Sequence, residues 1–388
     1  MMDSNPNTIK TDYVTVDVSF HPKKEVLAAG DIEGEVRLFS YASSGDCSEI
    51  MTLKHHKKAC RCLRFSNNGE ELYTASRDKS VQVIDLNTGS VKHKFKKAHD
   101  CPVYCMLVTG EHFIATGDDD GTIKVWDVRV NKEVIEVKEN EDFISDMGID
   151  PQKKILLVTS GDGTLSAFNI RRKKLELQSE LFESEFQCLA QMKGNEKVVC
   201  GSGEGVFYLF NRGEWGNMSD RFPALNSPPV SLDCMIPLTD DIVCVGCDDG
   251  NIRAVNILPN RIIGVVGDHD HFPVENLSLS HDKTLLASCS HDQTIKFWNV
   301  ESVKQQRVSD RSKAKKTSKS KMLASAGKDD FFSGLADDNE KEDEDDDDSS
   351  EDDSDNDEDD DESDENDDSD NDEDDDESDE NDDSDNDE

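Results

Sequence analysis

Residues 114–129 read Ile-Ala-Thr-Gly-Asp-Asp-Asp-Gly-Thr-Ile-Lys-Val-Trp-Asp-Val-Arg, an acidic, glycine-containing turn between two alternating apolar segments. The second segment ends in Trp126-Asp127, and six other segments of the chain end in a bulky residue followed by Asp, Asn or Ser. Those endings are Phe39-Ser40, Ile84-Asp85, Phe168-Asn169, Phe210-Asn211, Val255-Asn256 and Trp298-Asn299. Successive endings lie 45, 42, 42, 42, 45 and 43 residues apart, so the chain repeats one unit seven times.

A period near 42 residues with this ending is typical of a β-propeller blade, in which each repeat forms one four-stranded sheet. Within a repeat, alternating apolar segments are separated by Asn-, Asp- and Gly-rich turns, as the pattern of strands and tight turns requires. We therefore expect an all-β, seven-bladed WD40 propeller over residues 12–304. Two segments could complete the last blade, residues 302–308 or residues 6–12, and either would cover an open sheet edge.

The net charge of −44 on 388 residues comes almost entirely from the end of the chain, because residues 337–388 contain 38 acidic residues and one lysine. Such a segment cannot bury apolar surface and repels itself, so it is predicted to be disordered. The predicted organisation is an N-terminal segment (1–11), the propeller (12–304), a basic linker (305–327), a short motif (328–336) and the acidic tail (337–388).

Targeting and redox signals favour the cytosol or nucleus. The first residues lack the apolar stretch of a secretory signal, and no run of 18 apolar residues predicts a membrane helix. The eleven cysteines are scattered through predicted strands, which is typical of reduced, buried thiols.

Several residues of the repeat are expected to stabilise the blades. In WD-repeat propellers a turn aspartate six residues before the tryptophan joins a strand Ser or Thr, a loop His and the indole in one hydrogen-bonded set. The matching residues are Asp78, Asp120, Asp162, Asp249 and Asp292, with His99 upstream of the third repeat and the indoles of Trp126 and Trp298. A buried carboxylate needs such partners. For the seventh repeat His269 and His271 both remain candidates, and the five repeats that do not end in a tryptophan are expected to depend on packing.

Two short motifs could suggest chemistry, but both have a simpler explanation. His269-Asp270-His271 could share one face of a strand as metal ligands, although no third ligand follows at a recognisable spacing. Cys244 and Cys247 resemble half of a zinc or redox motif, yet on a strand they point to opposite faces. No nucleophile elbow, phosphate loop or acid pair is found. We expect a binding protein without catalytic residues, cofactor, metal or small-molecule substrate.

The third repeat is the one that ends in Trp-Asp-x-Arg. Residues 114–129 are similar to the box found in WD-repeat substrate receptors of cullin-4 ubiquitin ligases. The resemblance makes Trp126, Asp127 and Arg129 candidates for binding the ligase adaptor, with the planar guanidinium of Arg129 as the critical group. The alternative is an ordinary blade with an arginine at its edge, since most of the box is good blade sequence.

The C-terminal region offers three further candidates. A run of lysines fits a nuclear or nucleolar localisation signal and could touch RNA phosphate indirectly, although a solvated linker is the alternative; it comprises Lys313, Lys315, Lys316, Lys319 and Lys321. Phe331, Phe332 and Leu335 form a candidate linear motif, or a stray apolar pair. The acidic tail could bind basic proteins such as histones or ribosomal proteins. Basic patches are also expected at Lys57, Lys58 and Arg61 and at residues 171–174.

Taken together, residues 12–335 resemble the WD repeat-containing protein 55 family. The resemblance rests on the order of the repeats, on phrases such as Val16-Asp-Val-Ser-Phe-His-Pro22 and Ala98-His-Asp-Cys-Pro-Val103, and on Asp330-Phe-Phe-Ser-Gly-Leu335 after a basic segment. It implies a nucleolar, non-enzymatic protein, with some cytoplasmic presence, that acts with pre-ribosomal factors in ribosomal RNA production and large-subunit assembly. A plant member of the family is linked to the cullin-4 adaptor.

Overall fold

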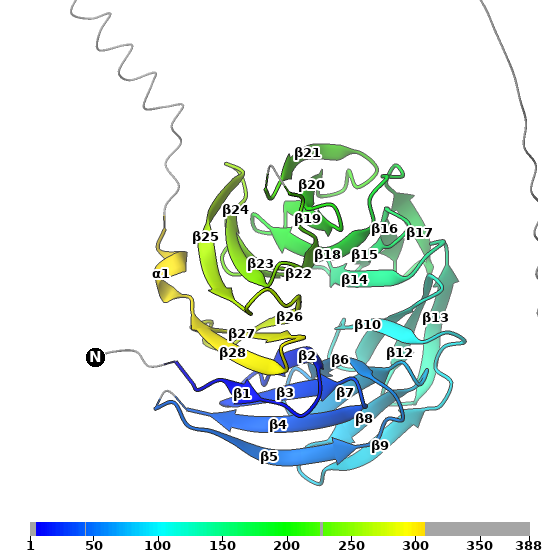
Figure 1. Ribbon diagram of the computed structural model, residues 1–388. Coiled ribbons are helices and arrows are strands. Elements are labelled where there is room, and N and C mark those ends of the chain that lie inside the picture. Colours follow the sequence, from blue (N-terminus) through cyan, green and yellow to red (C-terminus); the bar gives the residue numbers. More distant parts are fainter. Residues whose placement is uncertain (1–4, 43, 226–227, 307–388) are drawn as a thin grey trace, which may run out of the picture. The chain divides into compact units, whose positions relative to one another are not determined.

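The computed structural model describes residues 5–42, 44–225 and 228–306, and these form a ring of seven four-stranded antiparallel sheets (Figure 1). The predicted seven-bladed propeller is therefore confirmed. Six of the blades consist of four strands that follow one another in sequence and are simple meanders, whereas the seventh combines β26, β27 and β28 with β1. Among the described residues no helix has the length and apolar character that crossing a membrane requires.

The blades contain the following strands, from the centre of the ring outward. Blade 1 is β2 (Thr15–Phe20), β3 (Val26–Asp31), β4 (Glu35–Tyr41) and β5 (Cys47–Lys54); blade 2 is β6 (Cys60–Phe65), β7 (Glu71–Ser76), β8 (Val81–Asp85) and β9 (Ser90–Phe95); blade 3 is β10 (Val103–Val108), β11 (Phe113–Asp118), β12 (Thr122–Asp127) and β13 (Lys132–Lys138); blade 4 is β14 (Ile144–Ile149), β15 (Ile155–Ser160), β16 (Leu165–Asn169) and β17 (Lys174–Gln178). Blade 5 is β18 (Phe186–Met192), β19 (Lys197–Ser202), β20 (Val206–Asn211) and β21 (Met218–Pro223); blade 6 is β22 (Leu232–Pro237), β23 (Ile242–Cys247), β24 (Asn251–Asn256) and β25 (Arg261–Asp268); blade 7 is β26 (Val274–Leu279), β27 (Leu285–Ser290), β28 (Thr294–Asn299) and β1 (Ile9–Lys10).

The N-terminal segment closes the ring. Strand β1 pairs antiparallel with β28, with Ile9 opposite Ile295 and Lys10 opposite Thr294. Of the two segments that could complete the last blade, the structure uses the N-terminal one, and residues 301–304 form the short helix α1 (Glu301–Lys304) instead of a strand. The propeller thus begins before residue 12, which corrects the predicted boundary. The reason is physical, since an outer strand from the other end of the chain covers the edge of β28.

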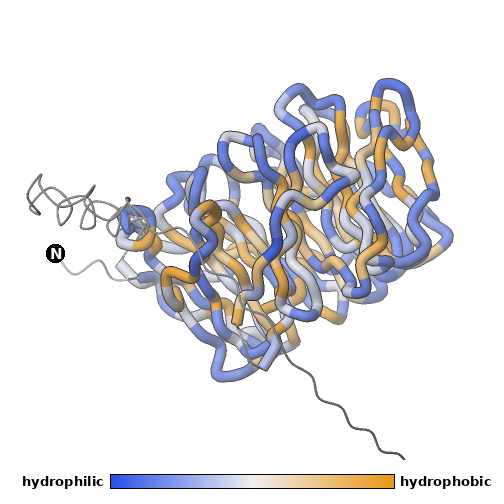
Figure 2. The backbone as a smooth tube through the Cα atoms, turned by 90° about the horizontal axis from the view of Figure 1, so that it is seen from above, coloured by the Kyte–Doolittle hydropathy of each residue, from blue (hydrophilic) through white to orange (hydrophobic). Residues whose placement is uncertain are grey.

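Apolar clusters between neighbouring sheets hold the ring together. Seven such clusters occur in the described part of the chain, each built from two adjacent blades. Figure 2 shows the same division, with apolar stretches inside the strands and polar stretches in the loops around them. Cys244 belongs to the cluster between blades 6 and 7, and Cys247 to the cluster between blades 5 and 6. The two thiols therefore lie on opposite faces of β23, as alternation along a strand requires.

Glycine has a steric role in the turns between the second and third strands. Gly121 has φ of +76°, and a Cβ at this position would lie 2.2 Å from the carbonyl oxygen of Asn140 in the following inter-blade loop. Glycine stands at the matching place in four other blades, at Gly34, Gly163, Gly205 and Gly250. Blades 2 and 7 differ, because Lys79 and Gln293 adopt positive φ there (67° and 60°). These turns and the inter-blade loops share one face of the ring, which we call the upper face.

Candidate protein-binding surfaces and the groups that position them

Blade 3 contains a hydrogen-bonded chain that starts at its tryptophan. The indole Nε1 of Trp126 donates to Thr116 Oγ1 (2.8 Å), Thr116 Oγ1 lies 2.7 Å from His99 Nε2, and His99 Nδ1 lies 2.8 Å from Asp118 Oδ2. If the ring of His99 carries its proton on Nδ1, it donates to the Asp118 carboxylate and its Nε2 accepts from the Thr116 hydroxyl, so both ring nitrogens have a partner. His99 and Asp118 are almost fully buried, so the chain of bonds is needed to keep these polar groups inside the blade.

The aspartate of this chain is Asp118 and not Asp120, which corrects the prediction from spacing. Asp118 ends strand β11, and its Oδ1 also accepts the backbone N–H groups of Asp120 and Thr122. The Asp118 carboxylate therefore both caps the turn and binds His99. Asp120 is exposed and pairs with Lys138. Burial by itself raises the pKa of Asp118, but the bonds from His99 and the backbone hold it below its ordinary value. In four other blades a serine ends the second strand. An aspartate at this position in blade 3 was therefore the sequence signal that could have identified Asp118 as the partner of His99.

Blade 7 contains the same hydrogen-bonded network, but its aspartate lies closer in sequence to the tryptophan than in blade 3. Trp298 Nε1 donates to Ser288 Oγ (2.8 Å), His269 Nε2 lies 2.7 Å from the same oxygen, and His269 Nδ1 lies 2.8 Å from Asp292 Oδ2. His269 is thus the histidine of the network, while His271 is exposed in the loop. Burial lowers the pKa of His269 despite its contact with Asp292, which agrees with a neutral ring.

Blades without tryptophan still contain polar networks, which the sequence interpretation missed. In blade 2, His56 contacts Asp78 (3.3 Å) and Thr74 (2.8 Å), although Ile84 stands where the indole would be. In blade 4, the amide of Asn140 takes the place of the imidazole and donates to Thr164 and Ser166 and, at 3.3 Å, to Asp162. In blade 6, Asp249 instead forms a two-point ion pair with Arg253. The turn aspartate is therefore retained, and its partner varies.

Arg129 is held in a defined position at the lower edge of blade 3. Its Nε donates to Asp127 Oδ1 (3.0 Å) and its Nη2 to Asp127 Oδ2 (2.6 Å), while the guanidinium lies 5.7 Å from the centroid of the Phe113 ring. The Arg129 side chain is nevertheless 54% exposed. Such a two-point pair orders the guanidinium without covering it, so it remains available for a polar contact with another protein.

The surroundings of Arg129 contain apolar surface and a groove. Val130 is 65% exposed, and Phe113 and Val134 are each 37% exposed. Beside them, a groove of about 710 Å³ runs between the lower turns of blades 2 and 3 and has Arg129 in its wall. Trp126, in contrast, is buried in the blade, so of the three box residues it positions the surface and does not form it.

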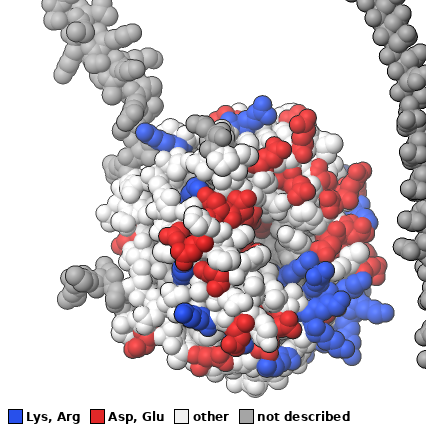
Figure 3. All heavy atoms as spheres, in the orientation of Figure 1, with Lys and Arg blue, Asp and Glu red and all other residues white. Residues whose placement is uncertain are grey.

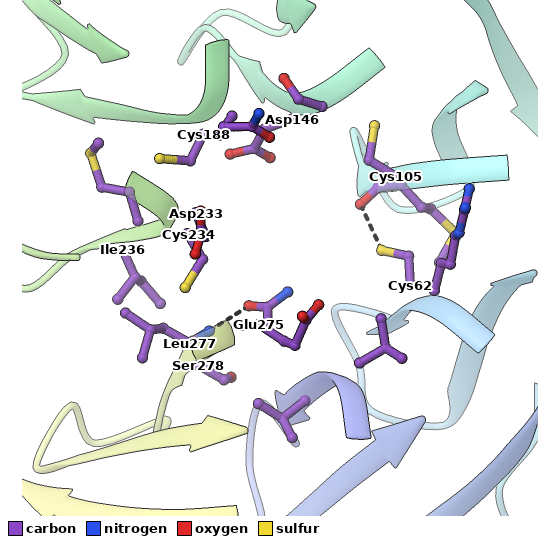
Figure 4. A pocket seen from close by; sticks show the side chains of 18 of the residues that line it. Cys62, Cys105, Asp146, Cys188, Asp233, Cys234, Ile236, Glu275, Leu277 and Ser278 are labelled. Carbon is purple, nitrogen blue, oxygen red and sulfur yellow. Dashed lines mark hydrogen bonds between the residues drawn. The ribbon is translucent and has the colours of Figure 1, made fainter. Parts of the chain in front are cut away.

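The inner strands enclose a central cavity of about 480 Å³, shown in Figure 4. The third residue of each inner strand follows a shift in register, and four of these residues are cysteines, Cys62, Cys105, Cys188 and Cys234. Burial raises the pKa of Cys62 to about 12 and the pKa values of the other three well above the ordinary range. These thiols stay protonated at neutral pH, which makes them poor nucleophiles and poor metal ligands.

The other three blades have Asp17, Asp146 and Asn276 at this position. Asp17 is fully buried, and it joins three blades because it accepts hydrogen bonds from Leu63 N (2.6 Å), Arg64 Nη1 (2.7 Å) and Asn276 Nδ2 (2.7 Å). Asp146 accepts from Met147 N (2.8 Å) and Leu189 N (2.9 Å), and no Lys or Arg among the described residues forms an ion pair with it. The cavity is therefore lined by groups that fix one blade to the next.

The burial of Asp146 leads us to expect a specific pH dependence of the free energy of unfolding. Burial raises the pKa of Asp146 to about 6, against the backbone bonds and the more distant Arg64. Because the folded-state pKa lies above the unfolded one, the contribution of Asp146 to stability is fully present below about pH 4 and is lost as pH rises through 6, by up to about 3 kcal/mol. Asp146→Asn should remove this loss, so the difference in unfolding free energy between the variant and wild type should grow in favour of the variant between pH 4 and pH 7. Parallel pH profiles in urea denaturation would contradict the assignment.

The candidates of the C-terminal region lie outside the described residues. They are the lysines 313, 315, 316, 319 and 321, the motif residues Phe331, Phe332 and Leu335, and the acidic tract 337–388. Of the two basic patches, Lys57 and Lys58 are exposed on the upper face, whereas residues 171–174 are exposed at the opposite, lower face. Arg61, the third predicted member of the first patch, is partly buried on β6 and pairs with Asp119 (2.6 Å).

Comparison with known proteins agrees with this geometry. A model of the WDR55 family matches residues 6–303. The chain is 43% identical over 354 residues to WD repeat-containing protein 55 of Bos taurus, covering 90% of this chain and 92% of that protein. It is 43% identical over 339 residues to the Homo sapiens protein of the same name, covering 86% and 88%. It is 44% identical over 297 residues to the Drosophila persimilis homolog, covering 76% of this chain and 58% of that protein.

Proposed function

Because this chain belongs to the WD repeat-containing protein 55 family, we propose that it is a non-enzymatic scaffold of the nucleus and nucleolus that acts in ribosomal RNA production and large ribosomal subunit biogenesis. Family membership is the observation that carries the proposal. A closed propeller offers two rigid loop-bearing faces and an outer edge to several proteins together, which suits an assembly factor. The lysine run at 313–321 supports nuclear import.

Depletion of the protein tests this function. Loss of the chain should raise the ratio of precursor to mature large-subunit RNA in a Northern blot, and the full chain should restore that ratio. A fluorescent fusion should concentrate in nucleoli, and replacing the five lysines of the run by glutamine should reduce this enrichment. Unchanged precursor levels after depletion would overturn the proposal, whatever the protein's location.

A second candidate function is that of a substrate receptor for a cullin-4 ubiquitin ligase. The observation that favours it is the presentation of Arg129, which Asp127 and Phe113 hold at an exposed edge beside apolar side chains. An ordered guanidinium next to exposed apolar surface has the composition of an interface hot spot.

Arg129→Ala is expected to reduce recovery of the cullin-4 adaptor in a pull-down by about tenfold or more, since an anchoring arginine contributes on the order of 2 kcal/mol to binding. Arg171→Ala is the matched control, because Arg171 is exposed at the same place in blade 4, which ends Phe-Asn-Ile-Arg. Unfolding temperatures of both variants should stay near wild type. Equal adaptor recovery by all three chains would exclude this function.

A third candidate is a chaperone of histones or ribosomal proteins that acts through residues 337–388. The charge of that tract favours salt-sensitive association with basic proteins. A chain ending at Leu335 should then fail to retain core histones that the full chain retains at low salt. Equal retention by both chains would exclude the tract as the binding element.

A further inference from the structure

The upper face of blade 2 carries a cluster of exposed cations that the proposed function does not yet use. Its members, which we call the blade 2 basic surface, are Lys57, Lys58, Arg77, Lys79, Lys96 and Lys97. Figure 3 shows the largest group of Lys and Arg at the lower right of the face in view, while Asp and Glu lie in several separate groups elsewhere on it. Basic side chains are thus most concentrated in one sector of this face.

Backbone contacts show that these residues form one continuous surface. The amide of Arg77 donates to the carbonyl of Ala59, directly after Lys58. The amide of Ala98, directly after Lys97, donates to the carbonyl of Lys79, and Lys79 Nζ donates to the carbonyl of Asp100. The turn with Arg77 and Lys79 therefore lies between the two loops that carry the other four cations.

The cations of this surface are not neutralised by neighbouring carboxylates. Within the described ranges none of the six forms an ion pair, whereas other lysines of the upper face do, as in Lys138–Asp120 and Lys54–Glu35. Asp78, a carboxylate beneath the surface, is occupied by His56, Ser80 and the Lys57 amide, and Asp100 contacts Lys79 through its backbone carbonyl. An unpaired cluster of this size repels itself, so an anionic partner would be bound favourably.

Lys79 is also held in an unfavourable backbone conformation. Its φ of 67° occupies the place where five other blades have glycine, and a side chain there costs about 1 kcal/mol. The side chain of Lys79 thus adds a positive charge to the cluster at a turn where five other blades have no side chain.

The neighbours of the surface indicate what kind of anion fits. On the blade 1 side, the loop with Lys58 packs on the turn at Gly34, next to Ile32 and Tyr13, which are each 42% exposed. Carboxylates border the cluster on both sides, Glu33 in blade 1 and Asp119 and Asp120 in blade 3. A long nucleic acid would meet these carboxylates, whereas a short acidic peptide with an apolar residue matches the basic sector and its apolar border.

We propose that the blade 2 basic surface binds a short acidic segment of a partner protein, with an apolar residue of that segment against Tyr13 and Ile32. This inference deepens the proposed scaffold function, because it names the surface and the chemistry of one partner. Carboxylates of the segment lie against Lys57, Lys58, Arg77, Lys79, Lys96 and Lys97, and the acidic blades on either side set its direction and limit its length.

The test is a titration of the full chain into a short fluorescein-labelled peptide of Asp and Glu with one central Leu, followed by anisotropy. The surface variant changes Lys57, Lys58, Lys79 and Lys97 to Gln, and it should raise the Kd by about tenfold or more. The matched control changes Lys23, Lys132, Lys153 and Lys283 to Gln; these are exposed lysines of the lower face, and two of them also have positive φ. The control should change the Kd by less than about twofold.

Five results would overturn the proposal. The first four are absence of binding by the wild-type chain, equal loss in surface and control variants, equal binding of the Asn/Gln version of the peptide, and tighter binding of a single-stranded RNA of the same length by the same surface. Binding that requires removal of residues 337–388 would name that tract as the occupant and also overturn the assignment to a partner. The titration does not involve precursor RNA levels, so its failure and the failure of the proposed function are separate outcomes.

Discussion

Asp118→Ala is expected to lower the free energy of unfolding by about 3–5 kcal/mol, because it removes one partner of a buried, charge-assisted network. His99 would lose the acceptor of its Nδ1 proton, and the amides of Asp120 and Thr122 would lose theirs. The imidazole could then turn, so the bond through Thr116 to Trp126 would weaken as well. Thermal and urea unfolding followed by tryptophan fluorescence measure the change.

Asp120→Ala provides the control for this variant. Asp120 lies two residues away in the same turn, but its side chain is exposed and makes a surface pair with Lys138. Removing it should cost less than about 0.5 kcal/mol. A larger loss from Asp120→Ala than from Asp118→Ala would restore the residue suggested by spacing and contradict the network described for blade 3.

Asp17→Ala is expected to destabilise the chain by a similar amount, about 3–5 kcal/mol, through the contacts that join blades 7, 1 and 2. The substitution leaves Arg64 beside the cavity without its carboxylate and leaves the Leu63 amide and the Asn276 side chain without their acceptor. Because these groups belong to three inner strands, hydrogen exchange should rise first in β2, β6 and β26.

The control for Asp17 is Asp12→Ala in the loop before the same strand. Asp12 is 77% exposed and pairs with Arg37, so its removal should cost less than about 1 kcal/mol. If protection from hydrogen exchange falls uniformly over the seven blades in Asp17→Ala, the Asp17 carboxylate does not act mainly where blades 7, 1 and 2 meet.

The polar networks show where sequence reasoning succeeds and where it stops. Trp126 and Trp298, the tryptophans at blade endings, identified blades 3 and 7 as the blades with indole donors there, and the structure places both indoles on a strand hydroxyl. Spacing selected Asp120, since all turn aspartates were aligned on the tryptophan. It could not show that an aspartate two residues earlier, at the end of β11, reaches the same imidazole and caps the turn.

The spacing of residues also does not show which side chain replaces another as a hydrogen-bond partner in a network. His56 and Asn140 precede their blades at the place of His99, but their roles depend on which side chains point at them across the blade. A one-letter pattern distinguishes His from Asn, yet both can donate to a carboxylate. Spacing therefore predicted the turn aspartates of blades 2, 4, 6 and 7, but it did not predict the partners of Asp78, Asp162 and Asp249.

From the sequence alone follow the seven repeats, the all-β propeller and the family, because the period of 42–45 residues and the strand alternation are properties of consecutive residues. Only the tertiary structure decides the closure by β1, the choice of Asp118 and His269, the ordered Arg129 and the continuous blade 2 basic surface. The closure, the two networks and the basic surface depend on distances between residues that are far apart in the chain, and the order of Arg129 depends on side-chain geometry beside Asp127 and Phe113. Such distances are set by how the sheets pack around the ring, and no local pattern encodes them.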